Sequence, residues 1–117
     1  MSAEPTIVTA LGALVSNRVF PDVAPENTER PYITYQQIGG VGINFLDQGT
    51  IPNKRHARFQ INVWADTRAA VVTLMEQVEA AIRGLTTLQP TVEAAAVALY
   101  EPDTGLRGSR QDFSFLS

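Results

Sequence analysis

Hydrophobic and polar positions alternate most clearly between Arg55 and Trp64. Phe59, Ile61 and Val63 fall on one side of this segment, and mostly polar side chains fall on the other. A repeat of two residues predicts a strand with one buried face and one polar face. The polar face also carries Trp64, the only tryptophan in the chain, and so large a ring requires a surface that covers it.

A helical repeat follows this strand and predicts a helix from Thr67 to Gly84. Asp66 or Thr67 is suited to cap its first turn, and Gly84 is suited to end it. Apolar residues at spacings of three and four form the face that we expect to be buried: Val71, Leu74, Met75, Val78 and Ile82.

The first part of the chain predicts a helix from Ser2 to Ser16, followed by a short extended segment from Val19 to Pro21. Pro5 fits the first turn of the helix, and Gly12 indicates a point of close packing. The apolar stripe of the helix consists of Ile7, Leu11, Leu14 and Val15.

Three further strands are expected. Their β-branched and aromatic residues favour a strand from Tyr32 to Ile38, and alternation favours another from Ser109 to Leu116. The segment from Ala94 to Glu101 is alanine-rich and compatible with a helix, although its valine, leucine and tyrosine favour a strand. Pro102 to Gly105 has the composition of a turn.

Gly39 to Arg55 is the least regular segment and holds four glycines and Pro52. We expect a long loop or a hairpin arm, because loops of this length in small domains usually have a function. Bulky apolar residues on such an excursion need a partner surface. This makes them candidates for an interface: Ile43, Phe45, Leu46 and Ile51.

Together these elements predict an α+β fold, with two helices packed on a mainly antiparallel sheet of about four to five strands. A long loop or hairpin arm lies between the early strands. The 117 residues fit a single domain spanning residues 1–117.

Composition removes several classes of function. The chain has no cysteine, which excludes disulfides, thiolate metal sites and cysteine nucleophiles. Its net charge is −3 and its pI about 5.0, whereas domains that wrap nucleic acid are usually basic. No apolar run is long enough to span a membrane, and no basic residue precedes the first apolar run as in a secretory signal.

No catalytic, metal or cofactor site is expected. His56 is the only histidine and has no evident carboxylate partner, so a surface position is the simpler interpretation. The glycines after Ile38 lack the lysine and hydroxyl of a phosphate-binding loop. The acidic loop from Asp22 to Glu29 lacks calcium-binding spacing, and Ser109 and Ser114 lack a nucleophile context.

Lys54, Arg55 and Arg58 form a small basic cluster around His56. The simpler interpretation of the cluster is a charged strand end that discourages edge pairing, and the alternative is an electrostatic contact to a protein or DNA partner. We therefore include these three residues among the interface candidates.

Four motifs, taken in order, resemble the tail completion proteins of tailed bacteriophages. They are Asn17-Arg18-Val19-Phe20-Pro21, Arg30-Pro31-Tyr32-Ile33-Thr34-Tyr35, Gln60-Ile61-Asn62-Val63-Trp64-Ala65-Asp66-Thr67 with the helix after it, and Arg110-Gln111-Asp112-Phe113-Ser114-Phe115. The resemblance covers nearly the whole chain, and the order and spacing of the motifs carry it. The segment from Glu93 to Ala98 matches least well.

The resemblance implies a structural protein without catalysis or cofactor. It implies a ring of copies, a hexamer in the virion and a monomer when isolated, at the head-proximal end of the tail tube. The implied partners are the tail tube protein and the head connector protein, with nucleic acid contacted only in a ring lumen and no membrane. The implied location is the bacterial host cytoplasm during assembly and then the tail or neck of the virion.

In such a ring, Trp64 is suited to contact a neighbouring subunit, because interfaces are enriched in tryptophan, tyrosine and arginine. The other explanation is that the N-terminal or C-terminal segment of the same chain covers it. A further hypothesis pairs the acidic loop of one copy with the basic cluster of the next. The alternative to phage assembly is a small non-enzymatic α+β ligand- or protein-binding module.

Overall fold

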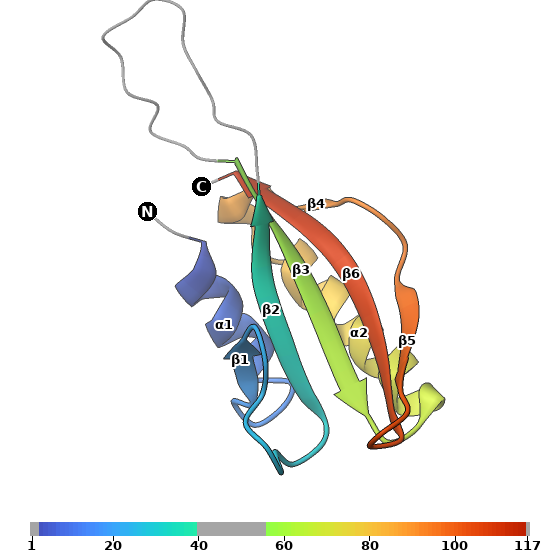
Figure 1. The fold of residues 1–117 in the computed structure, drawn as a ribbon. Helices are drawn as coiled ribbons and strands as arrows, with labels where there is room; N and C mark the ends of the chain where they lie inside the picture. Colours follow the sequence, from blue (N-terminus) through green and yellow to red (C-terminus); the bar gives the residue numbers. More distant parts are fainter. Residues whose placement is uncertain (1–2, 40–55, 117) are drawn as a thin grey trace, which may run out of the picture.

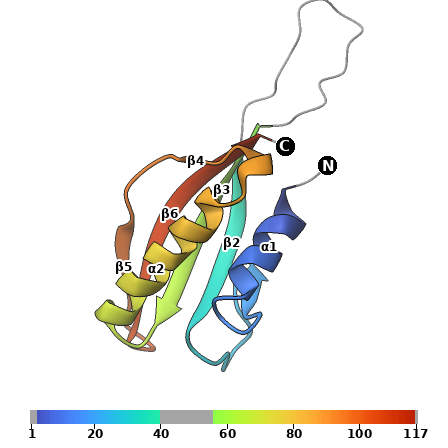
Figure 2. The same ribbon diagram turned by 180° about the vertical axis from the view of Figure 1, so that it is seen from behind.

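The computed structural model describes residues 3–39 and 56–116. Two helices lie on one face of a six-stranded sheet, and no helix of the described part covers the other face (Figures 1 and 2). The predicted α+β class is confirmed. The strand number is higher than the expected four to five, because the residues before the last strand contribute two short strands instead of one.

The sheet has the order β1–β2–β3–β6–β4, and β5 also pairs with β6. β1 runs parallel to β2, and the remaining pairs are antiparallel. The strands are β1 (Val19–Pro21), β2 (Tyr32–Gly39), β3 (His56–Ala65), β4 (Thr91–Val92), β5 (Val97–Glu101) and β6 (Leu106–Leu116).

β3 is the central strand and confirms the alternation seen in the sequence. Phe59, Ile61 and Val63 are all buried, at 2%, 0% and 0% exposure, beneath the helices. The β3–β6 pairing places Phe59 opposite Phe113, whose side chain is also fully buried. The core therefore lies between the helices and the face of the sheet that these residues share.

α2 (Arg68–Arg83) confirms the predicted second helix, and its five expected core residues are buried. Of the two candidate caps, Thr67 fills the position: its Oγ1 accepts a hydrogen bond from the Ala70 N–H at 3.1 Å. Gly84 follows the last helical residue, as predicted, and its N–H donates to the Ala80 carbonyl oxygen.

α1 (Glu4–Gly12) is shorter than the predicted helix from Ser2 to Ser16. The helix ends early because Ser16 and Asn17 take positive φ values of 50° and 65°, which no right-handed helix accommodates. Asn17 folds back on Gly12: its N–H donates to the Gly12 carbonyl oxygen at 2.8 Å, and its Oδ1 lies 2.8 Å from where a Cβ on Gly12 would be. The close packing expected at Gly12 is therefore confirmed.

Tyr35 ties α1 to the sheet. Its hydroxyl donates to Glu4 Oε1 at 3.0 Å, and the ring is only 6% exposed. Burial raises the pKa of Tyr35 to about 12, and the hydrogen bond and negative charge of Glu4 act in the same direction.

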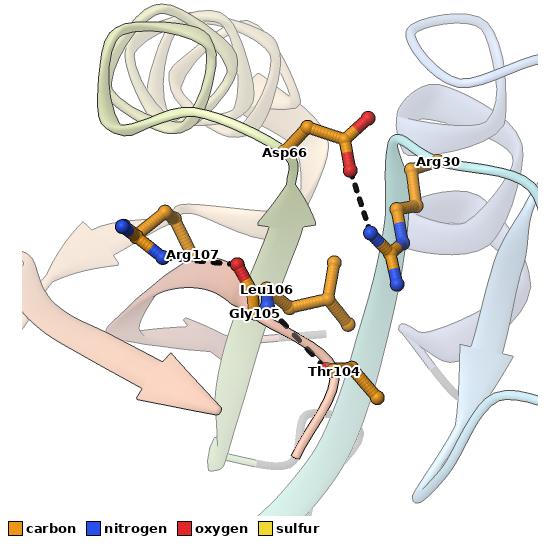
Figure 3. Close-up of polar contacts among 6 residues, drawn as sticks. All are labelled: Arg30, Asp66, Thr104, Gly105, Leu106 and Arg107. Atoms are coloured by element: carbon orange, nitrogen blue, oxygen red, sulfur yellow. Dashed lines mark hydrogen bonds and ion pairs between the residues drawn. The ribbon is translucent and has the colours of Figure 1, made fainter. Parts of the chain in front are cut away.

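The ambiguous alanine-rich segment contains a strand, β5, rather than a helix. The turn predicted from Pro102 to Gly105 leads from it into β6. Gly105 has a φ of 73°, its N–H donates to the Glu101 carbonyl oxygen, and its own carbonyl oxygen accepts from Arg107 Nη1 at 2.9 Å (Figure 3). Pairing with β6 has overridden the local helical preference of the alanines.

Candidate interaction surface

The face of the sheet opposite the helices, here called the helix-free face, is the candidate surface. Register places on it alternate side chains of β2, β3 and β6. Amides and hydroxyls predominate among them, with charges at three positions. They include Tyr32, Thr34, Gln36, Arg58, Gln60, Asn62, Trp64, Arg110, Asp112, Ser114 and Leu116, with Gly108 opposite Trp64.

Trp64 lies across three strands of this face. Its Nε1–H donates to Thr34 Oγ1 at 3.3 Å on β2, and its six-membered ring lies against Gly108 on β6. A Cβ on Gly108 would be only 2.7 Å from Cε3 and Cζ3 of the indole. The C-terminal strand of the same chain therefore accommodates one side of Trp64, in line with one of the two explanations from sequence, and the residue remains partly exposed.

Gly108 is a residue of this surface that sequence reasoning missed. An isolated glycine inside a strand indicates a close approach by another group. Gly108 stands next to the predicted strand that begins at Ser109, so this signal was present in the sequence. What the sequence lacked was the register that puts Trp64 opposite it.

Arg58 is already paired within the chain. Its Nη2 lies 3.0 Å from Asp112 Oδ2, across the β3–β6 pairing. Glu29 of the acidic loop similarly lies 3.7 Å from Arg18. The hypothesis that the acidic loop pairs with the basic cluster of a neighbour therefore depends mainly on Lys54 and Arg55.

The other interface candidates from sequence lie outside the described residues. These are Ile43, Phe45, Leu46, Ile51, Lys54 and Arg55, and with them the expected hairpin arm. Of the eight candidates, the structure places Arg58 and Trp64, and it places both on the helix-free face.

Arg68, at the start of α2, fixes the position of β5. Its Nη1 donates to the Gly108 carbonyl oxygen at 2.7 Å, and its Nη2 donates to the Leu99 carbonyl oxygen at 2.8 Å. Leu99 and Gly108 are register partners, so one guanidinium clamps the two strands from the helix side.

Gln111 ties the segment that precedes β5 to α2. Its side-chain amide donates to the Ala94 carbonyl oxygen at 2.9 Å and to Glu79 Oε1 at 3.0 Å on α2. The Gln111 hydrogen bond lowers the pKa of the Glu79 carboxyl, and that from Arg83 adds to it. Neither clamp was visible from sequence, because each joins residues distant along the chain.

A groove of about 460 Å³ lies between α2, the residues after α1 and the start of β2, and Leu14, Pro31, Ala70 and Leu74 are among its lining residues. Arg30 and Asp66 also line it, and they pair with each other at 2.6 Å (Figure 3). Because Arg30 and Asp66 pair with each other, neither of them offers an unpaired charge to a ligand in the groove.

The described residues hold no cluster of three or more histidine, cysteine, aspartate or glutamate side chains that could bind a metal. Ser109 and Ser114 are buried in the sheet, and Ser114 Oγ donates to Glu93 Oε1. None of the helices in the described ranges is long and apolar enough to cross a membrane.

Comparison with known proteins identifies the family of this chain. The solved "Virion of native gene transfer agent (GTA) particle" contains a chain with 18% sequence identity and a TM-score of 0.46, and the alignment covers 91% of this chain and 82% of that one. Comparison with curated proteins gives no match. The model of the family "Tail completion protein gp17" matches residues 5–117, which is nearly the entire sequence. This chain therefore belongs to the tail completion protein gp17 family of bacteriophage structural proteins.

Proposed function

We propose that this protein forms a ring that caps the head-proximal end of the tail tube and contributes to joining the tail to the head. The observation that carries the proposal is the family match over residues 5–117. A protein that completes a tail acts where tube growth ends, and that end must then meet the head. The proposed role is structural, with neither catalysis nor a cofactor.

The proposed partners are further copies of this chain, the tail tube protein and the head connector protein. The helix-free face supports this proposal, because it combines a partly exposed tryptophan, two arginines and several amides in a composition typical of interfaces. The proposed location is the tail or neck of the virion, after assembly in the cytoplasm of the bacterial host.

An in-frame deletion of the gene in the phage or prophage that carries it tests this proposal. Electron microscopy of the lysate should show separate heads and tails, with tails of uneven length because nothing ends tube growth. A plasmid copy of the wild-type gene should restore complete particles. Complete particles of normal tail length from the deletion strain would overturn the proposal.

The groove beside α2 is the observation that favours the alternative, a ligand- or protein-binding module. The same deletion separates the two functions. Normal particles, together with a monomer that recovers one soluble partner, would favour the binding module.

A further inference from the structure

The arginine side chains in residues 3–39 and 56–116 are, with one exception, bound to acceptors of the same chain. The exception is Arg110, which makes no hydrogen bond or ion pair with any of these residues. The bound guanidiniums and their acceptors are Arg18 with the Pro31 carbonyl oxygen, Arg30 with Asp66, Arg58 with Asp112, Arg68 with the Gly108 and Leu99 carbonyl oxygens, Arg83 with Glu79, and Arg107 with the Gly105 carbonyl oxygen. The described part of the chain therefore offers one arginine to a partner.

Arg110 lies in the interior of the helix-free face rather than at its rim. Its strand, β6, is flanked by β3 on one side and by β5 on the other (Figure 1). Register places Asn62 and Val97 beside Arg110 on these two strands, and Arg110 is only partly exposed. A partly buried arginine binds an incoming acceptor more strongly than a fully exposed one, because less water and salt screen the pair.

The neighbours of Arg110 have the composition of an interface centre. Trp64 lies in the next row of register partners on the same face and is partly exposed, and Val97 is 48% exposed. Gln60 lies in the row on the other side of Arg110. Tryptophan and arginine are enriched among the residues that dominate binding energy, and the groups around them exclude water. Arg110 and these neighbours therefore form a candidate binding site within the larger face.

The charges beside Arg110 favour a single carboxylate over a nucleic acid backbone. Asp112 is two residues away on the same face, and its side chain keeps 22% exposure although it pairs with Arg58. A run of phosphates laid across Arg110 would bring further negative charges against this carboxylate. A single carboxylate fits the planar fork of one guanidinium with two parallel hydrogen bonds.

A second copy docked face to face is a poor source of that carboxylate. The acidic side chains on or beside the helix-free face already accept hydrogen bonds within the chain. Asp112 accepts from Arg58, Glu93 accepts from the Ser114 hydroxyl, and Glu101 accepts from the Asp103 N–H. A face-to-face copy would have to share one of these carboxylates between two donors, so we assign the carboxylate to a different protein.

We propose that Arg110 anchors a partner-binding site and binds the carboxylate of an aspartate or glutamate of a different virion protein. Trp64 and Val97 pack against the same partner segment and exclude water from the ion pair. The inference rests on the proposed function, because it requires the chain to be part of an assembled particle. It adds the residue that makes the contact and the chemistry that the partner brings.

Purified particles that carry Arg110→Lys test the contact directly. Lysine keeps the positive charge, and a water-soluble carbodiimide joins its amine to a carboxylate in contact with it. Treated particles should give a product of this chain with another virion protein, which mass spectrometry locates at position 110 and at an aspartate or glutamate. The wild type gives the background, because Lys54 is the only lysine of the chain. Arg83→Lys is the matched control, because Arg83 is 61% exposed on α2, on the other side of the sheet, and should give no such product.

Two results of this experiment would overturn the inference. One is a set of products that join only copies of this chain. The other is no product at position 110 in particles that contain the variant, which is the result expected if the residue faces DNA. Absence of the wild-type protein from particles would instead contradict the proposed function, and the inference with it.

A second measurement follows assembly and also decides the case if Arg110→Lys does not enter particles. Arg110→Gln should lower the yield of complete particles about tenfold or more, because it leaves the partner's carboxylate buried without a countercharge. Arg83→Gln should leave the yield within about twofold. The melting temperature of the isolated Arg110→Gln subunit should stay within about 2 °C of the wild type, because the substitution removes no contact within the described chain. Equal yields from the two glutamine variants would overturn the inference.

Discussion

Gly108→Ala is the substitution whose effect follows most directly from the packing of Trp64. The added Cβ would lie 2.7 Å from Cε3 and Cζ3 of the indole and 3.1 Å from the Val63 carbonyl oxygen. Carbon atoms in favourable contact are about 3.5–4.0 Å apart, so the overlap is about 1 Å. The ring cannot move away freely, because its Nε1–H is bound to Thr34 Oγ1.

Overpacking of this kind destabilises the folded state by about 1–3 kcal/mol. Replacing glycine by alanine also reduces the conformational freedom of the unfolded chain, which offsets about 0.4–1 kcal/mol of that loss. We therefore expect the free energy of unfolding to fall by about 1–2 kcal/mol. For a chain of 117 residues, an unfolding entropy of about 2.1 cal/mol/K per residue converts this into a fall of about 4–8 °C in melting temperature.

Thermal unfolding followed by circular dichroism, combined with a double-mutant cycle, checks the mechanism. In a Trp64→Ala background, Gly108→Ala should cost less than about 0.5 kcal/mol, because the overlapping ring is gone. Gly84→Ala is the matched control: Gly84 has a φ of −73°, and its added Cβ meets nothing closer than 3.4 Å. An equal loss with and without Trp64 would refute the reasoning, since the cost would then come from the backbone.

Three further substitutions test the remaining contacts. Arg68→Met should lower the free energy of unfolding by about 1.5–3 kcal/mol and speed amide exchange in β5, because it removes the donors to Leu99 and Gly108; unchanged exchange in β5 would contradict the clamp. Because the pKa of Tyr35 is raised to about 12 in the folded state from 10.0, its contribution to stability is complete below pH 10 and is lost as the pH rises toward 12. The free energy of unfolding, measured with denaturant, should fall by up to about 2.7 kcal/mol over that pH range, and this fall should be smaller in Tyr35→Phe. Identical pH profiles for the wild type and Tyr35→Phe would refute the assignment. Thr67→Ala should cost about 1 kcal/mol in urea unfolding through loss of the helix cap, whereas Thr67→Ser should be nearly neutral.

The helix-free face shows how far sequence reasoning reached toward the candidate surface. Alternation placed Arg58 and Trp64 on the polar side of one strand, and the structure confirms that side for both. It could not show that Asp112 balances Arg58 or that Gly108 makes room for Trp64, because these partners are 54 and 44 residues away along the chain. The exposed apolar edge of β5 was equally hidden, since an alanine-rich segment does not reveal whether its neighbour is a strand or solvent.

The sequence by itself determined the type and the buried face of the regular elements. The repeat of two in β3 and the repeat near 3.6 in α2 are local properties, and burial of one face requires only that some core exists. The sequence pattern overestimated the length of α1, because the left-handed turn at Ser16 and Asn17 leaves no trace in hydrophobic periodicity.

Only the tertiary structure decided which strands pair, in what register, and which of them remain at the edges. Periodicity specifies the face of a strand but not its neighbour, and cross-strand contacts depend on side chains far apart in the chain. The position of β6 beside β3, with β5 left at the edge, is a choice among several sheets with the same buried faces. Packing of the whole core selects one of them, because the alternatives would not bring Phe59 against Phe113 or Trp64 against Gly108.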